Sequence, residues 1–373
     1  MNKVKNVYIA HTINSVAGSI IGVYIPAYLL TLGYPLSRVI LFYVISQGTG
    51  LLFLYLVLVP LMKKWGLLNT FKLYYPLQII FLILLSMIKT SGITPEIIAV
   101  FNGTATFAYW IPMNIYLIKH SNNQEMGSNI SKFFALPNLF GILGPLVGAI
   151  LIPIFGFVPI FVFTILGLLS SFVPLASVGD EGIDISLSFS KAWKRFLRNK
   201  TIFLFEFLEN IIEESEWFWS IYVFFIIGSL STPGIVGSLE AIGGSIFTLL
   251  FGKLANKHAK KLIPLTAFLL LLLYILRIFI KTPISAYSIT VFASFFLSFF
   301  MVAYYSTIYR TVKNDNEEEF MLIRDIPVVL GRMVVFVIVY LTLPFLRYFF
   351  LLPAMIISLL LLLYVRKRKL LAE

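Results

Sequence analysis

Long apolar runs follow one another along the whole chain, separated by short breaks rich in charged residues, glycine or proline. About 20 consecutive apolar residues form a helix that spans a bilayer. The pattern predicts an all-α polytopic membrane protein with twelve transmembrane helices. They lie near residues 6–31, 38–60, 70–89, 96–118, 129–152, 157–177, 201–228, 233–252, 262–281, 284–309, 322–344 and 346–365.

The longest polar connection divides the chain into two halves of six predicted helices. Residues 1–177 form the predicted N-terminal bundle, residues 178–200 a cytoplasmic central linker, and residues 201–373 the C-terminal bundle. The later part of the linker, from Phe189 to Phe196, fits a basic amphipathic helix on the inner leaflet equally as well as it fits a plain linker. Short basic turns recur at 59–68 and 252–261, which favours two duplicated halves around a central site, a common transporter plan.

Composition excludes several classes of protein. Of 373 residues, 59% are hydrophobic and only 12% are charged, whereas an ordinary soluble domain is roughly 25% charged. A soluble enzyme, a disordered chain and a fibrous repeat are therefore excluded. The chain has no cysteine, so it has no disulfide and no thiolate site. Its three histidines, His11, His120 and His258, lie far apart in sequence, and we expect neither a metal centre nor a cofactor.

The placement of the cations predicts the topology. A net charge of +12 could indicate a nucleic-acid partner, but most of the 29 lysines and arginines fall in the segments that share a side with the N-terminus. The other side holds only four, namely Arg38, Lys89, Lys281 and Arg347. The positive-inside rule then puts both termini of this multi-pass protein in the cytoplasm. We expect these cations to meet anionic lipids on the inner face of the plasma membrane, and we expect no nucleic-acid partner.

The predicted helix at 201–228 carries a stripe of acids. Glu206, Glu209, Glu213 and Glu216 fall within roughly 80° of one another over about 15 Å, at 100° and 1.5 Å per residue. A charge at the bilayer centre costs at least ~2.5–3.5 kcal/mol, so this stripe must face water, bind a cation or proton, or pair with a cation. Neighbouring carboxylates repel when ionised, which favours a bound proton. We predict proton or cation coupling here.

Alternatives to this interpretation stay open. The helix could begin later, which would leave the acids solvated, above all Glu206 at the inner end. Arg332, with Asp325 on the same face seven residues earlier, is the predicted ion-pair or anion site. Glu240 is a weaker coupling candidate. We expect Arg277 and Lys281 to reach towards the outer interface rather than to take part in the site.

Residues 252–261 resemble the helix-joining signature of the major facilitator superfamily. Gly252, Leu254 and Lys257 are among the matching positions, whereas Asn256 replaces the acid of that signature, and Lys63 takes the corresponding place in the first half. In the family this turn is a conformational latch, so Gly252, Leu254, Asn256 and Lys257 are the candidate latch, or the basic turn is only a topology signal. Gly144, Pro145 and Gly148 are similar to the glycine-proline motif of its proton-driven exporters, or serve helix packing alone.

The resemblance implies the major-facilitator-like arrangement in which the first, fourth, seventh and tenth helices line a central cavity. Polar and aromatic residues on those helices become candidates for substrate contact, although packing would explain each of them equally well. They are Asn14, Asn102, Thr106, Tyr109, Trp110, Asn210, Trp217, Tyr304 and Tyr305. Aromatic residues together with acids suit an amphipathic or cationic solute.

We therefore expect a secondary active transporter that moves a small solute by alternating access, in proton antiport that drives efflux of hydrophobic or cationic compounds. Uptake of a sugar or organic anion through Arg332 is an alternative. A transport-dead receptor or assembly protein is another, because the signature acids are missing. A membrane-embedded enzyme on lipid-linked substrates would need a catalytic constellation, and the sequence offers no such set. We expect no enzymatic activity.

Overall fold

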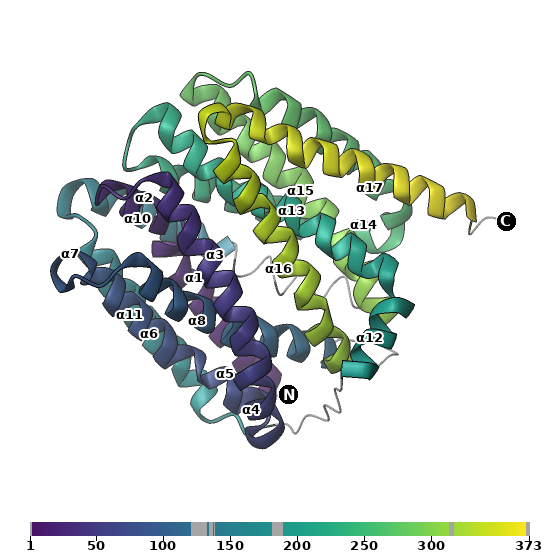
Figure 1. The fold of residues 1–373 in the computed structure, drawn as a ribbon, viewed down its shortest axis with the longest axis horizontal. Helices are drawn as coiled ribbons and strands as arrows, with labels where there is room; N and C mark the ends of the chain where they lie inside the picture. Colours follow the sequence, from purple (N-terminus) through teal and green to yellow (C-terminus); the bar gives the residue numbers. More distant parts are fainter. Residues whose placement is uncertain are drawn as a thin grey trace.

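The computed structural model describes residues 2–120, 133, 137, 139–180, 189–312 and 317–370, and within these ranges the chain is helical (Figure 1). The helices of the first half lie together on one side of the molecule, and those of the second half lie on the other. Side chains of 246–262, 302–317 and 362–370 lie outside the description, although their described backbone is helical.

Several spans of the first half consist of two or three helical pieces. α1 (Asn2–Gly22) continues into α2 (Ile25–Thr31), and α3 (Leu36–Phe53) continues through the π-helical turn η1 (Leu54–Leu58) into α4 (Val59–Trp65). Then follow α5 (Leu67–Lys72), α6 (Tyr74–Ser86), α7 (Ile88–Ser91), α8 (Pro95–Lys119), α10 (Leu143–Phe155) and α11 (Val158–Ala176). Gly66, with φ +83°, lies between α4 and α5, in a conformation that favours glycine.

The second half begins with a short helix, α12 (Phe189–Arg198), so the amphipathic stretch of the linker is helical. The later elements are α13 (Lys200–Ile227), α14 (Thr232–Arg277), α15 (Pro283–Val312), α16 (Glu317–Leu341), the 3₁₀ turn η2 (Leu343–Phe350) and α17 (Leu351–Leu370). α13 begins at Lys200, before the first of its acids. The alternative in which this helix begins later in the sequence is therefore wrong.

The longest helical run, α14, differs from the sequence expectation of two helices at 233–252 and 262–281. Its backbone is helical from Thr232 through Arg277. In a straight helix, Glu240 and Arg277 would lie about 55 Å apart at 1.5 Å per residue. Arg277 nevertheless pairs with Glu216, and Glu240 lines a cavity together with Glu216. The run therefore folds back on itself and supplies two antiparallel arms.

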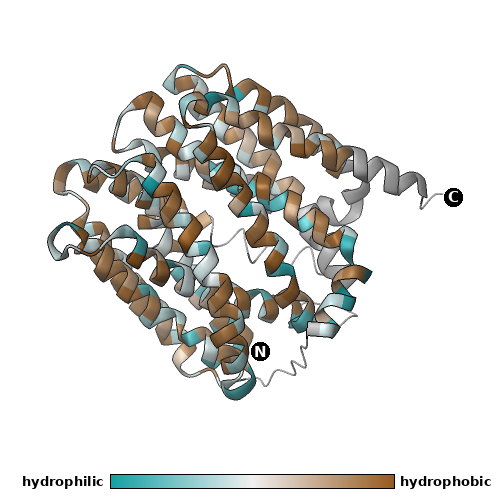
Figure 2. Ribbon diagram, viewed as in Figure 1, coloured by the Kyte–Doolittle hydropathy of each residue, from teal (hydrophilic) through white to brown (hydrophobic). Residues whose placement is uncertain are grey.

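Within the described part of the chain, six stretches are long and apolar enough to cross a membrane. They are Lys3–Thr31, Leu36–Trp65, Leu67–Ser86, Val158–Ala176, Pro283–Met301 and Leu343–Leu361. Figure 2 shows hydrophobic residues along the lengths of the helices. α8, α13 and α16 are long but carry more polar or charged side chains.

The interior contains two hydrophobic cores, one mainly in each half. One gathers residues such as Phe42, Phe81 and Tyr116 from the first half, and the other gathers Trp219, Tyr274 and Phe350 from the second. The halves meet where α10 packs on α14 and where α3 packs on α16. We call the end at which α1 begins and α4 ends the basic end, after Lys3, Lys5, Lys63, Lys64 and Lys72.

Candidate functional site

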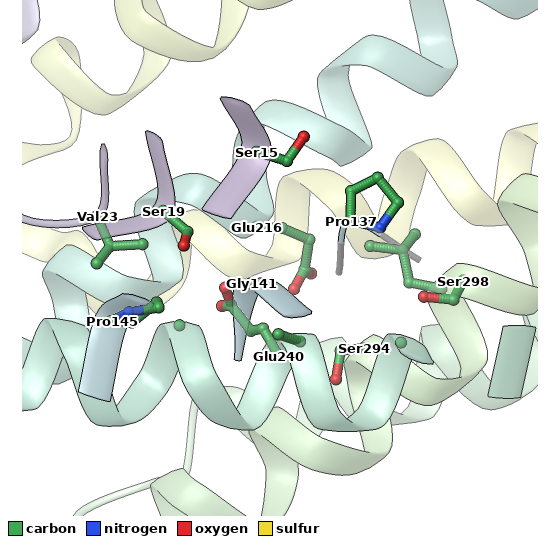
Figure 3. A pocket seen from close by; sticks show the side chains of 14 residues that line it. Ser15, Ser19, Val23, Pro137, Gly141, Pro145, Glu216, Glu240, Ser294 and Ser298 are labelled. Atoms are coloured by element: carbon green, nitrogen blue, oxygen red, sulfur yellow. The ribbon is translucent and has the colours of Figure 1, made fainter. Parts of the chain in front are cut away.

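A cavity of about 320 Å³ lies between the two halves of the molecule. The first half contributes residues of α1 and of the region leading into α10, and the second half contributes residues of α13, α14 and α15 (Figure 3). The lining consists of Ser15, Ser19, Val23, Pro137, Gly141, Pro145, Glu216, Gly237, Glu240, Ala241, Gly244, Ser294, Leu297 and Ser298. A solute bound here would touch both halves at once.

Glu216 on α13 is one of two acids in the cavity wall, and its charge is balanced. Arg277 donates two parallel hydrogen bonds to its carboxylate, at 2.7 and 2.8 Å. The guanidinium is fully buried and lies over the rings of Trp219 at 4.4 Å and Tyr274 at 4.9 Å. A bidentate arginine–carboxylate pair of this kind fixes both side chains in place.

Glu240 on α14 is the second acid, and no ion pair to it is found among the described residues. Its Oε1 atom is buried and has no hydrogen-bond partner among them. Figure 3 shows the carboxylates of Glu240 and Glu216 reaching into the same space. With Arg277 neutralising one of the two, the described lining holds one excess negative charge when both acids are ionised.

Four serine hydroxyls complete the polar lining. Ser15 and Ser19 lie on α1, and Ser294 and Ser298 lie on α15 across the cavity. The Ser19 hydroxyl donates to the Val16 carbonyl at 2.7 Å, and that of Ser294 donates to the Thr290 carbonyl at 2.9 Å. Their oxygen lone pairs are thereby free to accept hydrogen bonds from a ligand. Oxygen acceptors around an uncompensated carboxylate suit a cation or a proton.

Small residues let the helices around this cavity approach closely. A Cβ atom at Gly144 would collide with Ser19, and one at Gly148 would collide with the ring of Tyr24. Pro145, between them on α10, lines the cavity itself and accepts a hydrogen bond from the Tyr24 hydroxyl at 3.0 Å. The three motif residues thus lie where α10 packs on α1, as small residues do between membrane helices.

The other acids of α13 lie at its contact with α16. Glu206, expected to be the most solvated, is fully buried because Arg324 of α16 faces it, with its Nε at 2.6 Å from the carboxylate. Arg332 binds Glu213 at 3.0 Å, Glu214 at 3.5 Å and the Asn210 side-chain oxygen at 3.1 Å. These acids serve ion pairs between two helices, and of the predicted stripe only Glu216 lines the cavity.

Glu209 and Asp325 are also buried at this contact. Glu209 accepts a hydrogen bond from the Asn210 amide at 2.9 Å. Asp325 forms no ion pair with Arg332 among the described contacts, and its Oδ2 has no hydrogen-bond partner among them. The described ion pairs and hydrogen bond of Arg332 go to Glu213, Glu214 and Asn210 of α13.

None of the substrate candidates of the first half lines the cavity. Asn14 accepts a hydrogen bond from Tyr74 at 2.9 Å, and Asn102 donates one to Ser46 at 2.8 Å. Thr106 donates to the Asn102 carbonyl at 2.7 Å. Tyr109 hydrogen-bonds His11, and the Trp110 ring lies edge-on to the rings of both.

The remaining candidates lie in the second half. Trp217 packs on Tyr43 of α3, with ring centroids 4.2 Å apart. Tyr304 and Tyr305 lie on α15, but their side chains are outside the description. The same holds for the candidate latch residues, which lie on the helical backbone of α14 and whose side chains are not described. They are Gly252, Leu254, Asn256 and Lys257.

Sequence reasoning passed over Arg277 and the cavity serines. Arg277 was expected to reach the interface, yet it is fully buried, because Glu216 and two aromatic rings surround it. A signal was present: Glu216 and Arg277 are both charged residues in the interior of apolar helices, which favours pairing. Serine is too common in membrane helices for Ser15, Ser19, Ser294 and Ser298 to stand out.

The fold is similar to that of several solved transporters. The E. coli fucose:proton symporter FucP superposes with a TM-score of 0.72, at 12% identity over 98% of both chains. The nucleoside transporter NupG gives 0.67 at 13% identity, covering 98% of this chain and 99% of its own. A bacterial homologue of the iron transporter ferroportin gives 0.68 at 12% identity, covering 97% and 98%.

No family model and no curated protein sequence matches the chain. The structural likenesses nevertheless extend over nearly the whole chain, and a further FucP structure, with a TM-score of 0.71 at 11% identity over 98% of both chains, is described as a Major Facilitator Superfamily transporter. This polytopic membrane protein therefore has the fold of the major facilitator transporters, as the resemblance of residues 252–261 implied.

Proposed function

We propose that this protein is a secondary active transporter that moves a small cationic solute across the membrane by alternating access. The observation that carries the proposal is the cavity between the halves, where Glu240 stands without an ion partner among the described residues. Its volume, about 320 Å³, is at the small end of ligand cavities, which run from roughly 300 to 1,000 Å³. A compact amine or metal cation fits this space better than a large hydrophobic compound.

The same carboxylate supports proton coupling. A buried, uncompensated charge is costly, so the cavity is most stable when Glu240 holds either a proton or a cation. A proton and a monovalent cation would then compete for the one negative charge of Glu240. If the carrier converts between its inward-open and outward-open states only when that charge is neutralised, it exchanges the cation for a proton. We therefore propose proton antiport, with export as the direction that the Gly144-Pro145-Gly148 motif favours.

Uptake of an organic anion has less support. Arg332, the cation that would bind the anion, already contacts Glu213, Glu214 and Asn210. Two carboxylates beside one guanidinium leave no positive charge to attract an anion. A sugar remains the neutral alternative, because hydroxyls such as Ser15 and Ser298 could hydrogen-bond it, but it would leave the charge of Glu240 unused.

We further propose that the basic end faces the cytoplasm of a plasma-membrane protein, with residues 178–200 as the linker between the halves 1–177 and 201–373. The support is the cation count on the two sides, which the positive-inside rule converts into an orientation. Transport from the basic end outwards would then be export from the cell.

The test is flux into liposomes across an imposed pH gradient, with a panel of small organic and inorganic cations. Wild type should exchange at least one of them for protons, and Glu240→Gln should lower that flux by at least about tenfold while leaving folding intact. Glu96→Gln is the matched control, because Glu96 pairs with Arg38 at 2.7 Å and does not line the cavity. Equal flux in wild type and Glu240→Gln, or no gradient-driven flux of any cation, would overturn the proposal.

A further inference from the structure

A second hollow of about 720 Å³ lies away from the central cavity, and we call it the α12 groove. Its walls come from α12, α13 and α16, and Tyr55 of η1 adds one residue from the other half. The lining consists of Tyr55, Ala192, Trp193, Phe196, Lys200, Phe203, Leu204, Phe207, Ile323, Ile326, Pro327 and Leu330. All of these but Lys200 are apolar or aromatic.

The groove is preformed by contacts that hold α12 against the bundle. The rings of Trp193, Phe196, Phe203 and Phe320 stack in a row, with successive centroids 5.7, 5.2 and 5.2 Å apart. Arg195 of α12 pairs with Glu319 of α16 at 3.4 Å. The Tyr55 hydroxyl donates to the Leu322 carbonyl at 2.7 Å, so the groove also spans the seam between the halves.

The groove opens to the surroundings rather than to the interior. Trp193, Leu204 and Leu330 line it and are 54%, 44% and 49% exposed, as expected of residues that face acyl chains. From Lys200 to Phe207 along α13 it extends about 10 Å at 1.5 Å per residue. Its shape is thus elongated along the helix, from the helix start towards the membrane interior.

Charge at one end of the groove is positive. Lys200 is exposed and lines the groove at the start of α13. α12, which forms one wall, carries Lys191, Lys194, Arg195 and Arg198 and no acid, and Arg195 pairs with Glu319 of α16. No acid is among the residues that line the groove. An apolar slot with a cationic rim complements a molecule that has an apolar tail and an anionic head.

We propose that the α12 groove binds one anionic phospholipid, with an acyl chain along α13 and α16 and the phosphate at Lys200. Basic pockets between membrane helices on the cytoplasmic side are known to hold such headgroups. The proposal concerns binding at this site and is independent of what the central cavity transports.

The test uses the absence of native cysteine, which allows a single fluorescent label. Leu204→Cys places the label in the groove, and Leu166→Cys places it on the exposed surface of α11, where Leu166 is 54% exposed. Each labelled protein is reconstituted with phosphatidylglycerol or phosphatidylcholine that carries brominated chains, which quench the label on contact. At position 204, half-maximal quenching should need about fivefold less phosphatidylglycerol than phosphatidylcholine.

The preference for phosphatidylglycerol over phosphatidylcholine should be absent when the label is at position 166. With the label at position 204, Lys200→Gln should abolish this preference. Lys64→Gln, which removes an exposed cation of the basic end outside the groove, should leave it intact. Soluble glycerol phosphate should not compete, because the acyl chain supplies much of the binding. Equal quenching by the two lipids at 204, a preference that survives Lys200→Gln, or relief of quenching by glycerol phosphate would each contradict the proposal. Relief by small hydrophobic solutes would make the groove a solute site instead and would also contradict it.

Discussion

At the scale of single residues, the pair formed by Glu216 and Arg277 holds one wall of the central cavity in place. Arg277 is fully buried, and its guanidinium is enclosed by Glu216, Trp219 and Tyr274. Removing one partner of a buried pair leaves the other charge uncompensated, which costs more than the pair contributes. The position of Glu216 beside Glu240 therefore depends on an arginine that does not itself line the cavity.

Arg277→Gln should strongly destabilise the protein, by about 3–5 kcal/mol, the usual cost of breaking a buried pair. Thermal unfolding of the purified protein in detergent measures the loss. Replacing both partners, in Glu216→Gln with Arg277→Gln, should recover much of it because no charge then remains unpaired. Arg38→Gln is the matched control, and its effect should be much smaller because the Arg38–Glu96 pair is partly exposed. Equal losses in the two arginine variants would contradict this account.

The sequence predicted the acids of α13 but could not predict where each one points. Four carboxylates on one helical face follow from spacing alone, yet Glu206 and Glu213 turn to arginines of α16 while Glu216 turns to Arg277. Which helix lies beside which acid depends on the packing of the whole bundle. For the same reason the candidates Asn14 and Asn102 bond to Tyr74 and Ser46 within the first half rather than line the cavity.

At the scale of helices, the contact between α10 and α14 joins the two halves next to the cavity. A Cβ atom at Gly234 would collide with the Tyr24 hydroxyl and the Pro145 carbonyl. Ser231 donates to the Ala149 carbonyl at 2.8 Å, and Ser238 donates to the Ile142 carbonyl at 3.0 Å. Because Gly234, between these two serines, has no side chain, α10 and α14 come close enough for the serine hydroxyls to bond to the backbone of α10 and of the residue before it.

Gly234→Ala should force α10 and α14 apart, since the backbone carbonyl of Pro145 cannot move aside as a side-chain end could. Overpacking of this kind costs about 1–3 kcal/mol. We expect a lower unfolding temperature and a several-fold lower transport rate in liposomes. Gly18→Ala is the matched control, because a Cβ atom at Gly18 meets nothing within 4 Å. A Gly234→Ala protein as stable and active as Gly18→Ala would show that the close contact is not needed.

Most spans could be predicted from the sequence, because apolar runs of bilayer length are a strong signal. The predicted helix at 201–228 is α13 at Lys200–Ile227, and the one at 284–309 is α15 at Pro283–Val312. Two internal breaks were not predicted, the turn between α1 and α2 and the π-helical turn η1, although a proline stands at the start of the helix that follows each, Pro26 in α2 and Pro60 in α4. The sequence predicted two helices at 233–252 and 262–281, and the backbone of α14 is helical throughout although the run folds back into two arms.

At the scale of the whole molecule, contacts between the halves are also found near the basic end. Lys119, at the end of α8, pairs with Glu318 of α16 at 2.9 Å. The Tyr55 hydroxyl donates to the Leu322 carbonyl one helical turn further along α16. In the alternating access proposed above, the halves separate in turn at each end, so such contacts would break in every cycle.

Reversing one charge, in Lys119→Glu or Glu318→Lys, should replace attraction by repulsion between the halves and lower the transport rate several-fold. The double variant Lys119→Glu with Glu318→Lys should restore most of the rate, because it restores the pair in the opposite order. Flux in liposomes measures all three, and Lys64→Glu controls for a change of charge at the basic end. If the double variant is as slow as the worse single one, the pair is not what links the halves.

In the transport cycle proposed above, the cavity lined by Glu216 and Glu240 opens to each side of the membrane in turn. The most direct measurement is the reaction of Ser298→Cys, a cavity residue in a chain without native cysteine, with a membrane-impermeant maleimide added to one face of proteoliposomes at a time. Lys89→Cys, an exposed position outside the cavity, controls for sidedness. Alternating access predicts that position 298 reacts from both faces and position 89 from one face only. Reaction of position 298 from a single face under every solute and pH condition would contradict it.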